Sequence, residues 1–216
     1  MRWCDAPVGF DDPAVSVLAD RIAAAAHLPI EDTFVTLGWD GAGPARAYRC
    51  PWNQARALSA HVEQARVVGV GVFISCEDAA VVAQRRADWV LHPGVITTVG
   101  ESVNMGDVRG DAVVLHAAAA RGVEEELGVR VDPVRMGLVA VQVKPDAVVA
   151  WFAVHVPMVF AQIREHHAVA SHGDEGEPVA FAEAPGAAVL GARIDPWVVR
   201  KGLRACRLAA EQAPAA

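Results

Sequence analysis

The most informative segment of the chain is residues 117–129, which read AAAARGVEEELGV. On an α-helix, with about 100° of rotation per residue, four of its residues fall within one arc of roughly 140°, and Glu124 lies nearer the boundary of that arc. The four residues are Arg121, Gly122, Glu125 and Glu126. The apolar residues cluster on the opposite side, at Ala119, Ala120, Val123 and Leu127. The pattern predicts a helix whose apolar face packs on a sheet, while its other face presents two carboxylates beside a guanidinium.

Neighbouring carboxylates on one face repel each other, so a cation near them is favourable. Mg²⁺ fits this role because it prefers carboxylate and phosphate oxygens. Arg121 precedes Glu125 by one helical turn and can orient a glutamate through a charge-assisted hydrogen bond. A solvated acidic helix end with one Arg–Glu pair explains the same residues without any ligand. Both interpretations remain open at this point.

The segments around this helix predict further strands and helices. The helix itself is expected over about residues 112–127, closed by Gly128, and a polar loop is expected over 100–111. Apolar, β-branched runs predict strands near 67–75, 79–84, 95–99, 136–143, 147–156 and 178–183. Helices are expected near 159–168 and 195–212. The first part of the chain is expected to hold helices near 12–26 and 53–65 and strands near 33–39 and 45–50. Strand pairs interrupted by helices indicate an α/β protein of the α+β type, with a mixed sheet flanked by helices.

Residues 121–129 resemble the second half of the Nudix box, R-E-U-x-E-E-x-G-U, in which U is an aliphatic residue. The matching positions are Arg121, Val123, Glu125, Glu126, Gly128 and Val129. Gly122 departs from the pattern, since the family usually has a metal-binding glutamate there. Residues 84–86 resemble the strand before the box, and Pro93-Gly94 with Gly100-Glu101 is similar to the glycine-rich loop with its glutamate. Nineteen residues separate Glu101 from Arg121, where the family has seven, so residues 102–111 are interpreted as an insertion.

The resemblance implies a Nudix-like α/β/α sandwich with an N-terminal extension. We therefore expect an extension or small subdomain over residues 1–66, a Nudix-like domain over 67–212 and a tail over 213–216. It also implies binding of Mg²⁺ or Mn²⁺, with Glu125 and Glu126 as ligands, Glu101 as a further ligand and Arg121 as their orienting residue. Because Gly122 lacks a carboxylate, another acid is expected to compensate, and the candidates are Asp107, Asp111, Asp174, Glu175 and Glu177.

Two functions are compatible with this resemblance. The first is metal-dependent hydrolysis of a nucleoside-diphosphate-linked substrate or a related phosphoanhydride, in which Arg121, Glu125 and Glu126 act in catalysis. The second is a non-catalytic Nudix-fold module that binds a nucleotide-like ligand or a protein partner. An unrelated α/β protein with an acidic helix is a third interpretation.

Charge and composition narrow the range of partners and compartments. The net charge of −7 gives no strong nucleic-acid signal. The longest uncharged stretch, residues 147–162, is shorter than the roughly 20 residues that a membrane span requires. The four cysteines have no zinc-ligand spacing, which favours reduced thiols in a cytoplasmic protein. We expect a small nucleotide-like substrate, no membrane partner and a possible homodimer.

Three histidines on expected helices are interpreted as structural residues and not as metal ligands. His116 falls on the apolar side of the box helix and is expected to be a hydrogen-bonded core residue. His166 and His167 lie on an expected helix without a partner histidine one turn away, and are expected at the surface.

Overall fold

The computed structural model describes residues 1–4, 12–25, 32–39, 45–87, 94–181 and 196–211. The chain forms two compact units. The first comprises residues 1–70, 102–118 and 141–149, and the second comprises 71–101, 119–140 and 150–216. The predicted tail over 213–216 and Pro93 of the predicted glycine-rich loop lie outside the described residues.

The first unit combines short strands with two N-terminal helices. Its elements are β1 (Arg2–Cys4), α1 (Pro13–Ala25), β2 (Asp32–Leu37), β3 (Arg46–Pro51), α2 (Trp52–His61), a 3₁₀ turn η1 (Met105–Asp107), β8 (Val108–Arg109) and β9 (Ala112–Val113). Strand β1 is parallel to β3, whereas β2 is antiparallel to β3, so the sheet is mixed. Buried residues of α1, α2 and β2, among them Val15, Leu58 and Val35, form one apolar cluster. The predicted helices and strands of this region are confirmed, and β1 is an addition.

The second unit holds residues 119–127, the larger part of the predicted glutamate-rich helix. Its elements are β5 (Ala79–Arg86), β6 (Ile96–Thr97), a 3₁₀ turn η2 (Pro133–Arg135), α4 (Phe160–His167), a 3₁₀ turn η3 (Gly173–Glu175), β12 (Gly176–Phe181) and α5 (Pro196–Glu211). Five elements contribute residues to both units: β4 (Ala65–Cys76), β7 (Val99–Ser102), α3 (Leu115–Leu127), β10 (Gly137–Val143) and β11 (Ala147–Val156). Strand β5 is antiparallel to β4, β6 and β12.

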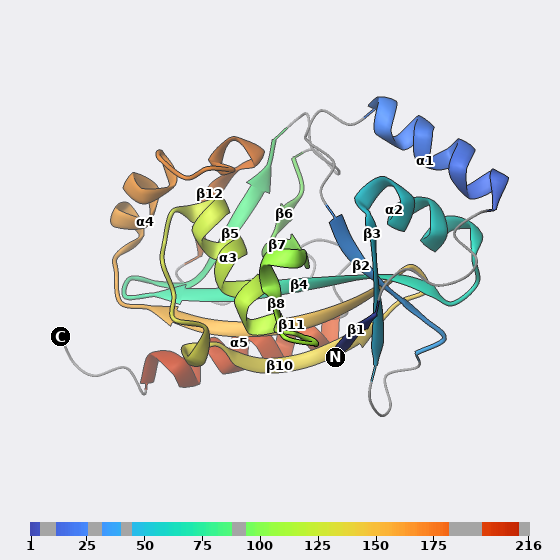
Figure 1. The fold of residues 1–216 in the computed structure, drawn as a ribbon. Helices are drawn as coiled ribbons and strands as arrows, with labels where there is room; N and C mark the ends of the chain where they lie inside the picture. The colour runs from blue at the N-terminus through green and yellow to red at the C-terminus, as the bar shows by residue number, and fades with distance from the viewer. Residues whose placement is uncertain (5–11, 26–31, 40–44, 88–93, 182–195, 212–216) are drawn as a thin grey trace. The chain divides into compact units, whose positions relative to one another are not determined.

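The second half of β4 is buried on both faces. Phe73 and Ser75 share one face, and the hydroxyl of Ser75 donates to the carbonyl oxygen of Cys206 in α5 (3.3 Å). Val72 and Ile74 point to the opposite face and are fully buried. Figure 1 shows α3 and α5 on opposite sides of β4. The predicted mixed sheet with flanking helices is therefore confirmed.

Helix α3 ends at the predicted glycine but starts later than predicted. Gly128 has a φ of +68°, a left-handed conformation that glycine adopts without steric strain. Its missing side chain leaves room for the backbone of α4, since a Cβ atom would lie 2.3 Å from the carbonyl oxygen of His166. The helix begins at Leu115 because Ala112 and Val113 pair with β8 as strand β9.

The expected loop over residues 100–111 is also more ordered than predicted. It contains the end of β7, η1 and β8. Asn104 and Asp107 cap η1 reciprocally, because each side chain accepts a hydrogen bond from backbone N–H groups at the other end of the turn. Short polar side chains thus accept hydrogen bonds from backbone N–H groups in a segment whose sequence has neither helical nor strand periodicity.

Candidate metal site

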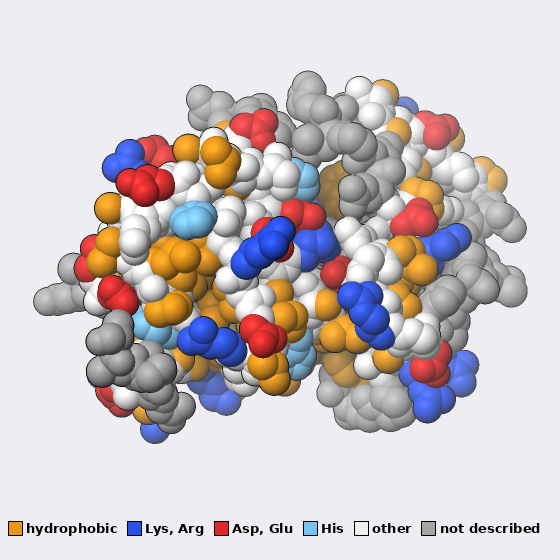
Figure 2. All heavy atoms as spheres, turned by 60° about the vertical axis from the view of Figure 1, so that its left-hand side comes forward, with side chains coloured by type: hydrophobic (Ala, Val, Ile, Leu, Met, Phe, Trp, Pro, Cys, Tyr) orange, Lys and Arg blue, Asp and Glu red, His pale blue; other side chains and the backbone are white. Residues whose placement is uncertain are grey.

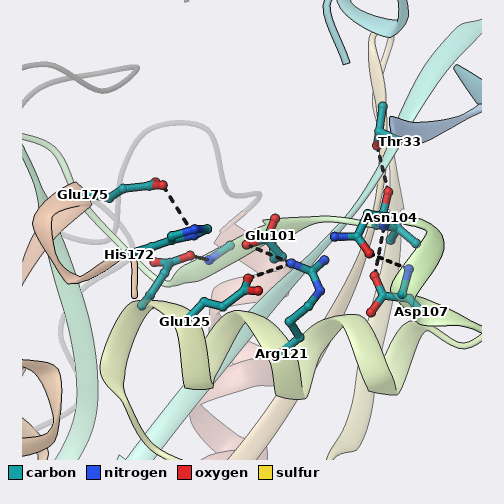
Figure 3. Close-up of polar contacts among 12 residues, drawn as sticks. Thr33, Glu101, Asn104, Asp107, Arg121, Glu125, His172 and Glu175 are labelled. Atoms are coloured by element: carbon teal, nitrogen blue, oxygen red, sulfur yellow. Dashed lines mark hydrogen bonds and ion pairs between the residues drawn. The ribbon is translucent and has the colours of Figure 1, made fainter. Parts of the chain in front are cut away.

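The exposed edge of α3 carries the predicted arginine–glutamate pair. Nη1 of Arg121 donates to Oε2 of Glu125 at 2.7 Å, one helical turn further along. The same Nη1 lies 3.6 Å from Oε2 of Glu101 in β7. Figure 3 shows the guanidinium between the two carboxylates. All three side chains are about one-fifth to one-quarter exposed, so the group is reachable from solvent and yet largely desolvated.

Gly122 allows Glu101 to approach the helix. A Cβ atom on Gly122 would lie 2.8 Å from the Cβ atom of Glu101 and 3.7 Å from a methyl group of Val99. Strand β7 therefore packs against α3 at the position where a box glutamate would project. The missing glutamate at Gly122 and the close approach of Glu101 are linked, because the glycine makes room for this glutamate of β7.

His172 completes a group that could hold a metal ion. One ligand atom each of Glu101, Glu125 and His172 lie within 4.8 Å of one another. The backbone N–H of His172 donates to the carbonyl oxygen of Glu125 at 2.8 Å, which ties this histidine to the last turn of α3. The three residues come from β7, α3 and the segment between α4 and η3.

Glu175 and Arg86 lie behind His172. Oε1 of Glu175 is 3.7 Å from Nδ1 of His172, and its Oε2 is 3.9 Å from Nη2 of Arg86 (Figure 3 shows the first contact). Burial raises the pKa of Glu175, and the charges of His172 and Arg86 oppose this shift. This carboxylate is therefore placed to orient the imidazole.

Glu126 is buried, in contrast to its neighbour Glu125. Only 3% of the residue is exposed, and its Oε1 accepts a hydrogen bond from the N–H of Gly100 at 3.3 Å. Its Oε2 has no hydrogen-bond partner among the described residues. Burial raises the pKa of Glu126 well above its ordinary value, and the negative charges of Glu101 and Glu175 raise it further. Glu126 shares the predicted polar arc with Glu125, yet it is buried because α3 is covered on this side as well.

The structure separates the other candidate acids. The carboxylate of Asp107 accepts the N–H of Asn104 and serves as a cap. Asp111 is exposed and lies 3.6 Å from Arg2. Asp174 and Glu177 are exposed, and of the five candidates Glu175 is the one close to His172.

Three other histidines differ from His172. His116 is exposed, so the expected core position is wrong: the residue lies in the first turn of α3, before the helix becomes enclosed. His166 is exposed as expected. His167 is half-buried, and its Nδ1 lies 2.9 Å from the carbonyl oxygen of Glu126. His172 stands in a polar loop with no motif around it, so the sequence did not indicate that it lies beside Glu101 and Glu125.

The face drawn in Figure 2 carries charged side chains of both signs. On the face drawn in Figure 2, the described Lys and Arg side chains are scattered among Asp and Glu and form no continuous basic area. Among the described residues, no helix is long and apolar enough to cross a membrane.

Comparison with known proteins finds similarity in solved structures. No family model matches the sequence, and no curated protein matches it. A MutT/Nudix family protein from Enterococcus faecalis shares 16% identity at a TM-score of 0.40; the match covers 54% of this chain and 43% of that protein, less than half its length. A MutT protein from Methanosarcina mazei Go1 shares 18% identity at a TM-score of 0.45, over 65% of this chain and 94% of that one. A Nudix hydrolase from Nitrosomonas europaea also shares 18% identity at 0.45, over 69% and 75%. Each of these three structures is named as a MutT or Nudix protein.

Proposed function

We propose that the chain is a Nudix-type pyrophosphohydrolase that requires a divalent metal ion. Its substrate would be a nucleoside diphosphate linked to a further group, or a related phosphoanhydride. The observation that carries the proposal is the convergence of Glu101, Glu125 and His172, whose ligand atoms lie within 4.8 Å of one another. Two of these residues are among the three glutamates that the Nudix resemblance implies as ligands.

The charges of the site fit a divalent cation. Four carboxylates, Glu101, Glu125, Glu126 and Glu175, face two guanidinium groups, Arg86 and Arg121. When all six groups are ionised, two negative charges are left over; burial raises the pKa of Glu126 and Glu175, so a nearby cation would favour the ionised form of both. Buried carboxylates without compensating charge are unfavourable, so a cation of charge +2 stabilises this arrangement. Mg²⁺ and Mn²⁺ both accept such oxygen ligands.

Each residue of the site has a distinct role in this proposal. Glu101 and Glu125 hold the metal ion, and Arg121 orients both carboxylates through its ion pairs. Glu126 fixes β7 to α3 through the N–H of Gly100 and is a further candidate ligand. When bound, a divalent metal ion polarises phosphoryl oxygens and lowers the pKa of a coordinated water molecule.

One observation favours a non-catalytic binding module instead. Arg121 pairs with both Glu101 and Glu125, so part of their charge is already neutralised without a metal ion. A module of this kind would bind a nucleotide-like ligand and leave it intact. The two functions therefore differ in turnover, and a binding measurement alone does not separate them.

The test is hydrolysis of a substrate panel by the purified chain with Mg²⁺ or Mn²⁺. The panel contains dinucleotides, nucleotide sugars and nucleoside triphosphates, and chromatography follows the products. We expect turnover that is lost in Glu125→Gln and kept in Glu124→Gln. Glu124 is the matched control, because it is an exposed neighbour in the same motif that pairs with Arg130. Turnover that is equal in both variants contradicts the proposed site, and saturable binding without turnover supports the binding module.

A cytoplasmic location and a homodimer are further parts of the proposal. Cys50, Cys76 and Cys206 are buried free thiols, as suits a reducing compartment. Size-exclusion chromatography with light scattering measures the oligomeric state directly.

A further inference from the structure

His172 offers a nitrogen donor beside Glu101 and Glu125, whereas the resemblance implies oxygen donors alone. The box position at Gly122 carries no carboxylate, and the space beside it is filled by the Cβ atom of Glu101. The donor set that the structure brings together therefore consists of two carboxylates and one imidazole. Such a mixed set suits a borderline transition-metal ion better than an all-oxygen set does, because imidazole is a softer ligand than carboxylate.

The surroundings of His172 are those of a metal-binding histidine. A metal-bound imidazole usually has its second nitrogen close to a carboxylate, which fixes the orientation of the ring. Here Nδ1 lies 3.7 Å from Oε1 of Glu175, a carboxylate that can orient the ring. Glu175 is in turn held near Arg86, and the main chain of His172 is bonded to Glu125. The ring is thus oriented from two sides.

A separate observation points to a missing cation. Glu126 is more than nine-tenths buried, and its Oε2 lacks a hydrogen-bond partner among the described residues. The other oxygen of the same carboxylate binds the N–H of Gly100, directly before Glu101. A buried carboxylate oxygen normally has a partner, and a cation held near Glu101 would supply one for this oxygen.

We propose that His172 is a direct ligand of the metal ion and that it makes the site selective for transition-metal ions over Mg²⁺. Glu175 is a positioning residue that acts through the imidazole. This inference rests on the metal site of the proposed function, but it concerns which ion is bound and not which substrate is hydrolysed.

The test is metal binding to the full chain, measured without substrate. Isothermal titration calorimetry gives the affinities for Co²⁺, Mn²⁺ and Mg²⁺, and pulsed electron paramagnetic resonance of bound Mn²⁺ detects coupling to a nitrogen nucleus. In the unchanged protein we expect a nitrogen coupling from imidazole. In His172→Ala we expect loss of this coupling, a fall in Co²⁺ affinity of about 10- to 100-fold and a much smaller change for Mg²⁺.

Two further variants control the result. His166→Ala removes an exposed histidine of α4 and should leave the coupling and the affinities unchanged. Glu175→Gln should retain the coupling while it weakens Co²⁺ binding less than His172→Ala does, because the ring remains present but less well oriented. Circular dichroism checks that each variant is folded, and if His172→Ala is unfolded, His172→Gln replaces it.

The outcomes separate this inference from the proposed function. Bound Mn²⁺ without nitrogen coupling in the unchanged protein overturns the inference, even if hydrolysis depends on Glu125. Equal loss of Co²⁺ and Mg²⁺ affinity in His172→Ala overturns the selectivity. Nitrogen coupling that depends on His172, in a protein that hydrolyses nothing, supports the inference while the proposed function fails.

Discussion

Gly122→Ala tests the contact that defines the site, because it adds one methyl group between α3 and β7. The new Cβ atom would lie 2.8 Å from the Cβ atom of Glu101, which is close to the backbone and cannot swing away as the end of a long side chain could. An ordinary contact begins near 3.4 Å, so strand and helix must separate by several tenths of an ångström.

The magnitude follows from two opposing effects. Overpacking of this kind costs typically about 1–3 kcal/mol. Replacement of a glycine inside a helix by alanine contributes about 1 kcal/mol in the opposite direction. Taking about 2 kcal/mol for the collision, we expect the free energy of unfolding to fall by about 1 kcal/mol. Affinity for Mn²⁺ should fall as well, because Glu101 moves away from Glu125.

Urea denaturation of a double-mutant cycle measures this effect. In a Glu101→Gly background the opposing Cβ atom is gone, so Gly122→Ala should now stabilise the protein by about 1 kcal/mol. The coupling between the two positions is then about 2 kcal/mol. If Gly122→Ala stabilises the otherwise unchanged protein as much as it stabilises the Glu101→Gly variant, there is no contact between these positions and the explanation of the glycine is refuted.

Three further predictions concern residues near the site. Glu126→Gln should raise the melting temperature of the metal-free protein, because a buried carboxylate becomes neutral, and should reduce the additional stabilisation by Mn²⁺; a lower melting temperature without metal contradicts this. Gly128→Ala should lower the free energy of unfolding by at least about 1–2 kcal/mol, since alanine is strained at a φ of +68° and collides with α4; an unchanged urea midpoint contradicts this. Burial lowers the pKa of His155 below its ordinary value, so stability is complete above the unfolded-state pKa, near 6.5, and declines as the pH falls below it. His155→Gln should flatten this pH dependence in thermal melts at pH 5 to 8, and an unchanged slope assigns the decline to other groups.

The box helix and the strands around it could be predicted because their residues follow simple periodic patterns. Val123 and Leu127 recur at helical spacing and are buried, and Gly128 ends the helix as expected. The long apolar runs became β4 and β11 for the same reason. Each of these predictions depends on residues that are close together in the sequence.

The full set of site residues could not be predicted because it depends on contacts between distant segments. A helical projection places Glu126 beside Glu125, but it contains no information on what covers that side of the helix, and Glu126 is buried. His172 stands in a polar loop without a motif, and its proximity to Glu101 arises only from the fold. In the sequence, Gly122 is a missing carboxylate. In the structure, its lack of a side chain leaves space for Glu101 beside the helix.

The bond between the N–H of His172 and the carbonyl oxygen of Glu125 has a consequence for synthesis of the chain. The ribosome releases β7 and α3 well before the segment that follows α4. Until that segment has folded back, the last turn of α3 lacks the histidine and the anchoring amide. The proposed metal ion would therefore meet all three candidate ligands only after this segment has folded back.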